Sequence, residues 1–168
     1  MQNIFLIGFM GAGKSTIASC LEKYYGMHLI EMDLQIAQKE QMSIASIFET
    51  RGEEYFRCLE TELLEGLQNQ KDMVVSCGGG VPMRQCNVEA MRRSGTVVYL
   101  SAAPETIYER IKNCHDRPLL EGNMNVKYIA ELMGKRMPAY LGAADVMIET
   151  DGREAEAICL EILRKCQK

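Results

Sequence analysis

The sequence predicts a three-layer α/β/α fold in which helices cover both faces of a five-stranded parallel sheet. Short apolar runs of strand length alternate with longer stretches whose apolar residues recur at helical spacing, a pattern typical of such sheets. A glycine-rich segment joins the first apolar run to the first helical stretch, and no linker, repeat or low-complexity tract divides the chain. The 168 residues are therefore expected to form a single domain, 1–168.

Apolar runs and local signals place the individual elements. The predicted strands are 3–7, 28–30, 73–77, 96–100 and 145–149. The predicted helices are 13–25, 43–70, 104–113, 126–140 and 153–166. Gly26 suits the residue after a helix, and Pro104 suits a first helical turn. The long helical region 43–70 is expected to break near Gly52, because glycine weakens a helix interior.

Composition excludes several classes of function. A net charge of -4 provides no overall attraction for nucleic acid or an anionic membrane, so neither partner is expected. The apolar runs are too short to span a bilayer, and the first residues lack the basic start of a secretory signal. Seven cysteines without a C-x-x-C pair suit reduced thiols rather than a zinc site. We therefore expect a cytoplasmic protein, and a monomer, since no long exposed apolar face is evident.

The segment from Gly8 to Thr16 matches the phosphate-binding motif G-x-x-x-x-G-K-[ST] between a predicted strand and a predicted helix. Its glycines let successive N–H groups face one anion, and the helix N-terminus adds positive charge. The lysine can reach the β and γ phosphates, and the first hydroxyl can coordinate Mg²⁺ directly. ATP and Mg²⁺ are the expected cofactors. The residues expected to bind the nucleotide here are Gly11, Ala12, Gly13, Lys14, Ser15 and Thr16.

The motif alone leaves a kinase, an NTPase and a GTP switch open, since all three use this loop. The guanine signature N-K-x-D and a suitably placed D-x-x-G segment are both missing from the sequence, which disfavours a GTPase. A kinase needs a second site that holds an acceptor hydroxyl in line with the γ phosphate. In a sheet of this kind, that site lies beyond the carboxyl ends of the strands.

Charged residues and glycines gather at those predicted strand ends. Asp33 could orient or deprotonate a hydroxyl, while Arg57 and Arg136 could grip a carboxylate through their forked donors. Gly78-Gly79-Gly80 would let a ligand or the backbone pass closely. Each residue also has a structural alternative. Asp33 could be a helix N-cap, Arg57 could pair with an acidic residue of its own helix, Arg136 could cover a helix face, and the triplet could be a plain turn.

The least regular stretch, 114–125, lies between two predicted helices and contains Arg117-Pro118 and Gly122. It is long for a connection within a small domain, which makes it a candidate mobile lid. The alternative is an ordinary surface loop.

On these residues the chain resembles the shikimate kinases of aromatic amino-acid biosynthesis over essentially its whole length. The segments that carry the resemblance are Gly8 to Thr16 with the pair Phe9-Met10, Asp33, Phe56-Arg57 with Glu60, Gly78-Gly79-Gly80, Arg117-Pro118-Leu119-Leu120, and Arg136 with Tyr140. The resemblance implies the strand order 2-3-1-4-5 and a P-loop kinase that phosphorylates the shikimate 3-hydroxyl with ATP. The open alternatives are a related kinase for gluconate or a nucleotide, and a nucleotide-dependent switch without acceptor chemistry.

The resemblance also implies roles for individual residues. Those implied to bind shikimate are Asp33, Arg57, Gly78, Gly79, Gly80 and Arg136. Those implied to be catalytic are Lys14, Asp33 and Arg117, the last through contact with the transferring phosphate and the nucleotide. Arg110 and Arg153 resemble nucleotide-contacting positions.

The chain departs from the family at its second strand end. Where the family usually has D-[ST]-D, this chain has Glu31-Met32-Asp33, so its first carboxylate is one methylene longer and the middle hydroxyl is missing. Glu31 and Ser76 are expected to reach Mg²⁺ only through water, with Ser15 as the direct ligand. The departure leaves Asp33 unchanged.

Overall fold

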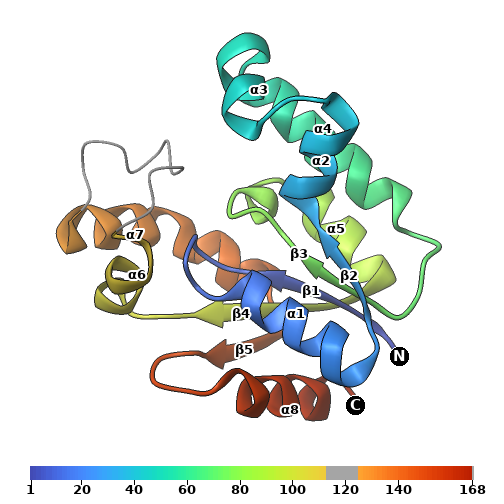
Figure 1. Ribbon diagram of the computed structural model, residues 1–168, viewed down its shortest axis with the longest axis vertical. Helices are drawn as coiled ribbons and strands as arrows, with labels where there is room; N and C mark the ends of the chain where they lie inside the picture. The colour runs from blue at the N-terminus through green and yellow to red at the C-terminus, as the bar shows by residue number, and fades with distance from the viewer. Residues whose placement is uncertain (113–124, 168) are drawn as a thin grey trace.

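The structure, a computed structural model, describes residues 1–112 and 125–167 and contains a five-stranded sheet (Figure 1). Its strands are β1 Asn3–Ile7, β2 His28–Glu31, β3 Met73–Ser76, β4 Gly95–Ser101 and β5 Val146–Glu149. They lie in the order β2-β3-β1-β4-β5, and every neighbouring pair is parallel. The predicted order and the five predicted strands are confirmed, with ends shifted by one residue at most.

Helices pack on both faces of this sheet (Figure 1). They are α1 Lys14–Tyr25, α2 Met32–Glu40, α3 Ile44–Arg51, α4 Glu53–Gly66, α5 Gln85–Ser94, α6 Pro104–Ile111, α7 Val126–Ala143 and α8 Ala155–Cys166, with a short 3₁₀ helix η1 at Val81–Met83. Every residue of β1 and β3 is buried, as expected for central strands covered on both faces. The predicted break near Gly52 is present, since this glycine separates α3 from α4 with a φ of 87°.

Two helices were not predicted, and both bury few large apolar side chains. In α2 only Met32 and Ile36 are buried, and the helix follows β2 without a connecting loop. In α5 the polar side chain of Asn87 is buried, because its amide donates to the Val81 carbonyl and its oxygen accepts from Thr61. A satisfied polar residue on the inner face of a helix weakens the apolar pattern from which a helix is inferred, and in α5 the helical spacing rests on Val88 and Met91.

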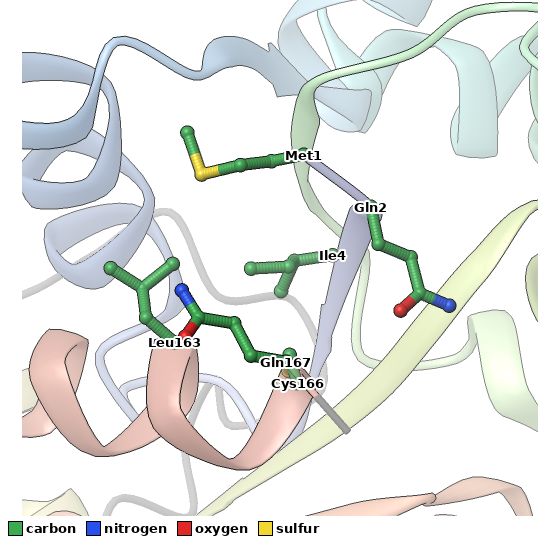
Figure 2. Close-up of a pocket in the computed structure, with 6 residues that line it drawn as sticks. All are labelled: Met1, Gln2, Ile4, Leu163, Cys166 and Gln167. Atoms are coloured by element: carbon green, nitrogen blue, oxygen red, sulfur yellow. The ribbon is translucent and has the colours of Figure 1, made fainter.

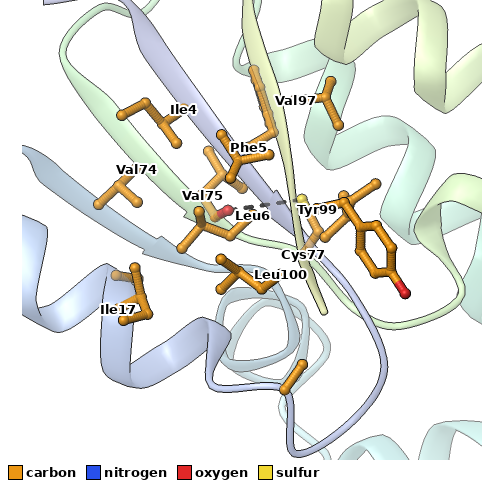
Figure 3. Close-up of a cluster of buried hydrophobic side chains, with 14 of the residues drawn as sticks. Ile4, Phe5, Leu6, Ile17, Val74, Val75, Cys77, Val97, Tyr99 and Leu100 are labelled. Carbon is orange, nitrogen blue, oxygen red and sulfur yellow. Dashed lines mark hydrogen bonds between the residues drawn. The ribbon is translucent and has the colours of Figure 1, made fainter. Parts of the chain in front are cut away.

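The main core fills the space around β1, β3 and β4, and Figure 3 shows Phe5, Val75 and Val97 among its side chains. A second, smaller cluster of Ile36, Ile47, Phe56 and Leu59 joins α2, α3 and α4. This small core holds together the helices that carry Asp33 and Arg57, two of the predicted acceptor residues. It therefore fixes these helices against one another, while Met32 of α2 and Leu64 of α4 join them to the main core.

Candidate active site

The loop between β1 and α1 forms the predicted phosphate cradle. Gly11 and Gly13 have φ angles of 78° and 100°, values that residues with a Cβ rarely adopt. The Ala12 N–H donates to the Phe9 carbonyl over 3.0 Å, which closes the turn. Gly13 then caps α1, whose first residue is Lys14. The backbone thus curls immediately before a helix N-terminus, the arrangement that binds phosphate groups.

Lys14 and Ser15 lie at the start of α1, facing the cradle and the neighbouring strand. The Lys14 Nζ donates to the carbonyls of Gly8 and Phe9 over 2.8 and 3.0 Å, so its charge lies over the loop. The Ser15 Oγ lies 3.5 Å from the Ser76 Oγ at the end of β3. Glu31 is the register partner of Ser76 on β2.

Ser15 at the start of α1, Ser76 at the end of β3 and Glu31 at the end of β2 supply two hydroxyl oxygens and one carboxylate. Hard oxygen ligands of this kind suit Mg²⁺. Among the described residues, no three His, Cys, Asp or Glu side chains gather as a metal site. A Mg²⁺ ion at Ser15 would therefore complete its shell with phosphate oxygens and water, as Mg²⁺ commonly does. The residues fit the ion.

Arg110 lies against the cradle, whereas Arg153 pairs elsewhere. The Arg110 Nη1 donates to the Gly11 carbonyl over 3.0 Å and to the Thr150 hydroxyl over 3.4 Å. Arg153 donates to the Glu149 carbonyl over 3.0 Å and to Glu161 on α8 over 2.6 Å. Arg110 therefore lies at the phosphate loop, whereas Arg153 bonds to Glu149 and Glu161 within the described part of the chain.

Thr150 was not anticipated from the sequence. It is buried, and its hydroxyl lies within hydrogen-bond distance of two carbonyls, that of Ser101 at 3.0 Å and that of Ala12 at 3.4 Å. It thus links the cradle to the end of β4. The available signal was a polar residue directly after the last strand, at the sheet edge where ligands bind.

The glycine triplet lies between the acceptor residues and the cradle. A Cβ built on Gly78 would lie 2.8 Å from Glu60 Oε1 and 3.3 Å from Asp33 Oδ1. A Cβ on Gly79 would lie 2.9 Å from Arg136 Nη1, and a Cβ on Gly80 would fall on the Arg57 guanidinium. All three charged side chains predicted on the acceptor side therefore pack against this one loop.

The same loop reaches the phosphate cradle. A Cβ on Gly79 would lie 3.7 Å from the Gly8 carbonyl, the atom that accepts from Lys14. Arg136 lies with its Cζ 6.0 Å from the centre of the Phe9 ring, within range of a cation–π contact. The acceptor side and the phosphate side are thus adjacent.

The sequence left open whether Arg57 pairs with an acidic residue of its own helix or lies in the acceptor site. The structure shows both: Arg57 forms such pairs and also lies beside Gly80. Its guanidinium donates to Glu60 over 2.8 Å and to Glu53 over 3.2 Å. Burial alone would lower the pKa of Arg57, but the two carboxylates outweigh it and raise that pKa. The pairs fix the guanidinium, so they orient the fork rather than remove it from the site.

Glu60 is a charged residue of the site to which the sequence analysis assigned no role. Its side chain is fully buried, and its Oε1 has no hydrogen-bond partner among the described residues. Burial raises the pKa of Glu60, while Arg57 opposes that shift. The uncompensated oxygen points at Gly78, so Glu60 presents an acceptor toward the glycine loop.

Asp33 is not the helix N-cap that was its structural alternative. The N-cap of α2 is Glu31, without a side-chain capping bond, and Asp33 lies in the first helical turn. Its carboxylate therefore faces Gly78 instead of closing the helix end.

Arg117 lies outside the described residues, as does all of the predicted lid 114–125 except its last residue. Asn125 is the N-cap of α7, its side chain accepting from the Tyr128 N–H.

Two surface hollows occur elsewhere. Figure 2 shows one of about 280 Å³, lined by Met1, Gln2, Ile4, Leu163, Cys166 and Gln167. The other is lined by residues around Asn3, Gln70 and Arg93. Both lie near the chain start, at the amino ends of the strands, and neither contains a predicted site residue. In the described ranges, none of the helices has the length and apolar character required to cross a bilayer.

Comparison with known proteins agrees with this geometry. A family model described as shikimate kinase matches residues 10–167. The chain is 41% identical to the shikimate kinase of Persephonella marina over 97% of this chain and 98% of that protein. It is 40% identical to the shikimate kinase of Dehalococcoides mccartyi strain 195, covering 99% and 94%. Shikimate kinase from Acinetobacter baumannii, solved in complex with shikimate, superimposes with a TM-score of 0.91 at 34% identity, covering 98% and 92%.

Proposed function

Because the chain belongs to the shikimate kinase family and is an ATP-dependent kinase, we propose that it transfers the γ-phosphoryl group of ATP to the shikimate 3-hydroxyl. The products are shikimate 3-phosphate and ADP, in aromatic amino-acid biosynthesis. One observation carries the proposal for this chain: the glycine triplet contacts Asp33, Arg57 and Arg136 on one side and approaches Gly8 on the other. An anionic acceptor held there lies beside the phosphate cradle.

Two arginines and one aspartate hold the acceptor, and they bind different groups of it. Arg57 and Arg136 bind the carboxylate, since two guanidinium groups can offer it parallel donors. Asp33 accepts a hydrogen bond from the hydroxyl that attacks, which orients it and gives its proton an acceptor. Gly78, Gly79 and Gly80 let these groups approach a small ring, because a Cβ at any of them would meet a charged side chain.

The nucleotide is held by the cradle residues 11–16 and by Arg110. Lys14 lies over the loop and offsets the charge that develops on the phosphates during transfer. Arg153 is proposed as a further nucleotide contact, and Arg117 as the contact to the transferring phosphate that the family resemblance implies.

Mg²⁺ is the proposed metal cofactor, with Ser15 as a direct ligand and Glu31 and Ser76 acting through water. When bound at these residues, the ion would neutralise part of the charge on the phosphates. Ser76 lies 3.5 Å from Ser15, so its hydroxyl is within reach of a water on the same ion.

Arg57→Lys is expected to weaken shikimate binding by roughly thirtyfold, about 2 kcal/mol, because lysine keeps the charge but loses the forked donors. Binding of a non-hydrolysable ATP analogue should change by less than about threefold. Isothermal titration calorimetry with each ligand measures both constants. Arg51→Lys, at an exposed position on α3, is the matched control. Equal losses for both ligands would give Arg57 a structural role only.

Acceptor choice is tested by thermal shift with an ATP analogue and shikimate, gluconate or a nucleoside monophosphate. At one hundred times its Kd, a bound acceptor stabilises the fold by about 2.7 kcal/mol. For a chain of this size that corresponds to a rise in Tm of roughly 5–10 °C. We expect this rise with shikimate alone. The paired arginines favour a carboxylate, which a nucleoside monophosphate lacks. Gluconate also carries a carboxylate, and membership of the shikimate kinase family favours shikimate over it. A rise in Tm with another acceptor but not with shikimate would contradict the proposal and indicate a related kinase that acts on that acceptor.

The chain is further proposed to act as a cytoplasmic monomer formed by one domain, 1–168, with no nucleic-acid or membrane partner. Its net charge of -4 supports the absence of a polyanionic partner.

A further inference from the structure

Tyr140 belongs to the R-x-x-x-Y segment but has no task in the proposed chemistry. Its side chain is among the largest fully buried ones, with 1% of its surface exposed. The hydroxyl donates to the carbonyl of Gly79 over 2.8 Å. A buried tyrosine on α7 is therefore tied to the middle of the acceptor loop.

The ring of Tyr140 is itself fixed. It stacks on Tyr99 of β4 with ring centroids 5.2 Å apart and an angle of 28° between the planes. Figure 3 shows Tyr99 at the rim of the main core, with its hydroxyl pointing away from the cluster. The core thus holds the Tyr140 ring, and with it the position of the hydroxyl.

Arg136 lies one helical turn before Tyr140 and shares its surroundings. A Cβ on Gly79 would lie 2.9 Å from Arg136 Nη1 and 3.6 Å from the Tyr140 oxygen. Burial raises the pKa of Tyr140, and the nearby positive charge of Arg136 opposes this shift. The Tyr140 hydroxyl and the Arg136 guanidinium therefore both lie against Gly79, the middle residue of the glycine loop.

The bond to Gly79 also orients its neighbour. The Gly79 carbonyl and the Gly80 N–H belong to one planar peptide group and point in opposite directions. Among the described hydrogen bonds, none uses the Gly80 N–H as donor. A run of three glycines allows many peptide orientations, and a fixed carbonyl removes most of them.

We propose that Tyr140 is a positioning residue for the acceptor: its hydroxyl sets the Gly79–Gly80 peptide and the Arg136 guanidinium in the orientation that binds the shikimate carboxylate. This inference rests on the proposed function, because it assigns Gly80 and Arg136 to shikimate. Tyr140 itself touches no reacting atom.

Tyr140→Phe removes the hydroxyl and keeps the stacked ring, so it tests this role with little change in packing. The kcat/KM for shikimate should fall by roughly tenfold, mainly through KM, while KM for ATP changes by less than twofold. Tyr99→Phe is the matched control, since it removes a hydroxyl from the partner ring without touching the loop. It should retain wild-type kinetics.

A second measurement does not depend on turnover. In ¹H–¹⁵N correlation spectra, the Gly80 amide signal should move in Tyr140→Phe and stay in place in Tyr99→Phe. Tyr140→Phe with wild-type kinetics, or with equal losses for shikimate and ATP, overturns the inference. Wild-type protein that does not phosphorylate shikimate would instead overturn the proposed function, so the two failures are distinguishable.

Discussion

Lys14→Met is expected to lower kcat by a thousandfold or more, about 4 kcal/mol of activation free energy. The ammonium lies over the cradle, 2.8 Å from the Gly8 carbonyl and 3.0 Å from that of Phe9. Methionine has a similar length and no charge, so it leaves the charge that develops on the phosphates without its counter-charge. Kinetics by coupled ADP detection measure the loss.

The fold should survive this change, because Lys14 is only partly buried and lies outside the hydrophobic core. Thermal unfolding and circular dichroism check this point. Lys23→Met removes a lysine from the exposed last turn of the same helix and should leave kcat unchanged. A Lys14→Met enzyme within tenfold of wild type would contradict the role given to this lysine.

Gly80→Ala is expected to weaken shikimate binding by a hundredfold or more, about 2.7 kcal/mol. The new Cβ would lie 2.5 Å from the Cζ of Arg57, too close for any non-bonded contact. The guanidinium must move, and it then leaves the position in which Glu60 and Glu53 hold it. Binding of an ATP analogue should be unchanged, which calorimetry with each ligand measures.

Gly134→Ala provides the control for a glycine-to-alanine change. Gly134 lies within α7, and a Cβ there has no atom within 4 Å. Alanine at this exposed helical position should stabilise the fold by up to about 1 kcal/mol and leave shikimate binding intact. If Gly80→Ala bound shikimate as the wild type does, the loop would not form the acceptor site.

The sheet and the phosphate loop could be predicted because local sequence determines both. The strands are continuous apolar runs, and a cradle of glycines followed by Lys14 has few other uses. The helices α2 and α5 were missed because their inner faces are short or polar, as Asn87 illustrates. Their presence depends on partners distant in sequence, such as Thr61, which periodicity does not report.

The candidate site also contains residues that could be predicted from the sequence and residues that could not. Asp33, Arg57 and Arg136 were predicted from their places near strand ends and from the family resemblance, and the structure brings all three to one glycine loop. The contacts of Thr150 and Tyr140 and the burial of Glu60 against Gly78 could not be predicted, because each depends on a part of the chain that folding brings near. Contacts between residues far apart in the sequence produce no motif or periodic spacing from which they could be recognised.

The most direct test of the account is ADP release by the wild-type protein with ATP and Mg²⁺, measured across candidate acceptors. Shikimate should raise the rate at least about a hundredfold above the acceptor-free rate, a difference of about 2.7 kcal/mol. Nucleoside monophosphates lack the carboxylate that Arg57 and Arg136 would bind, and gluconate is the acceptor of a different kinase family, so both should leave the rate unchanged. ADP release that is equal with and without shikimate would contradict the assignment of these residues to a shikimate-binding site.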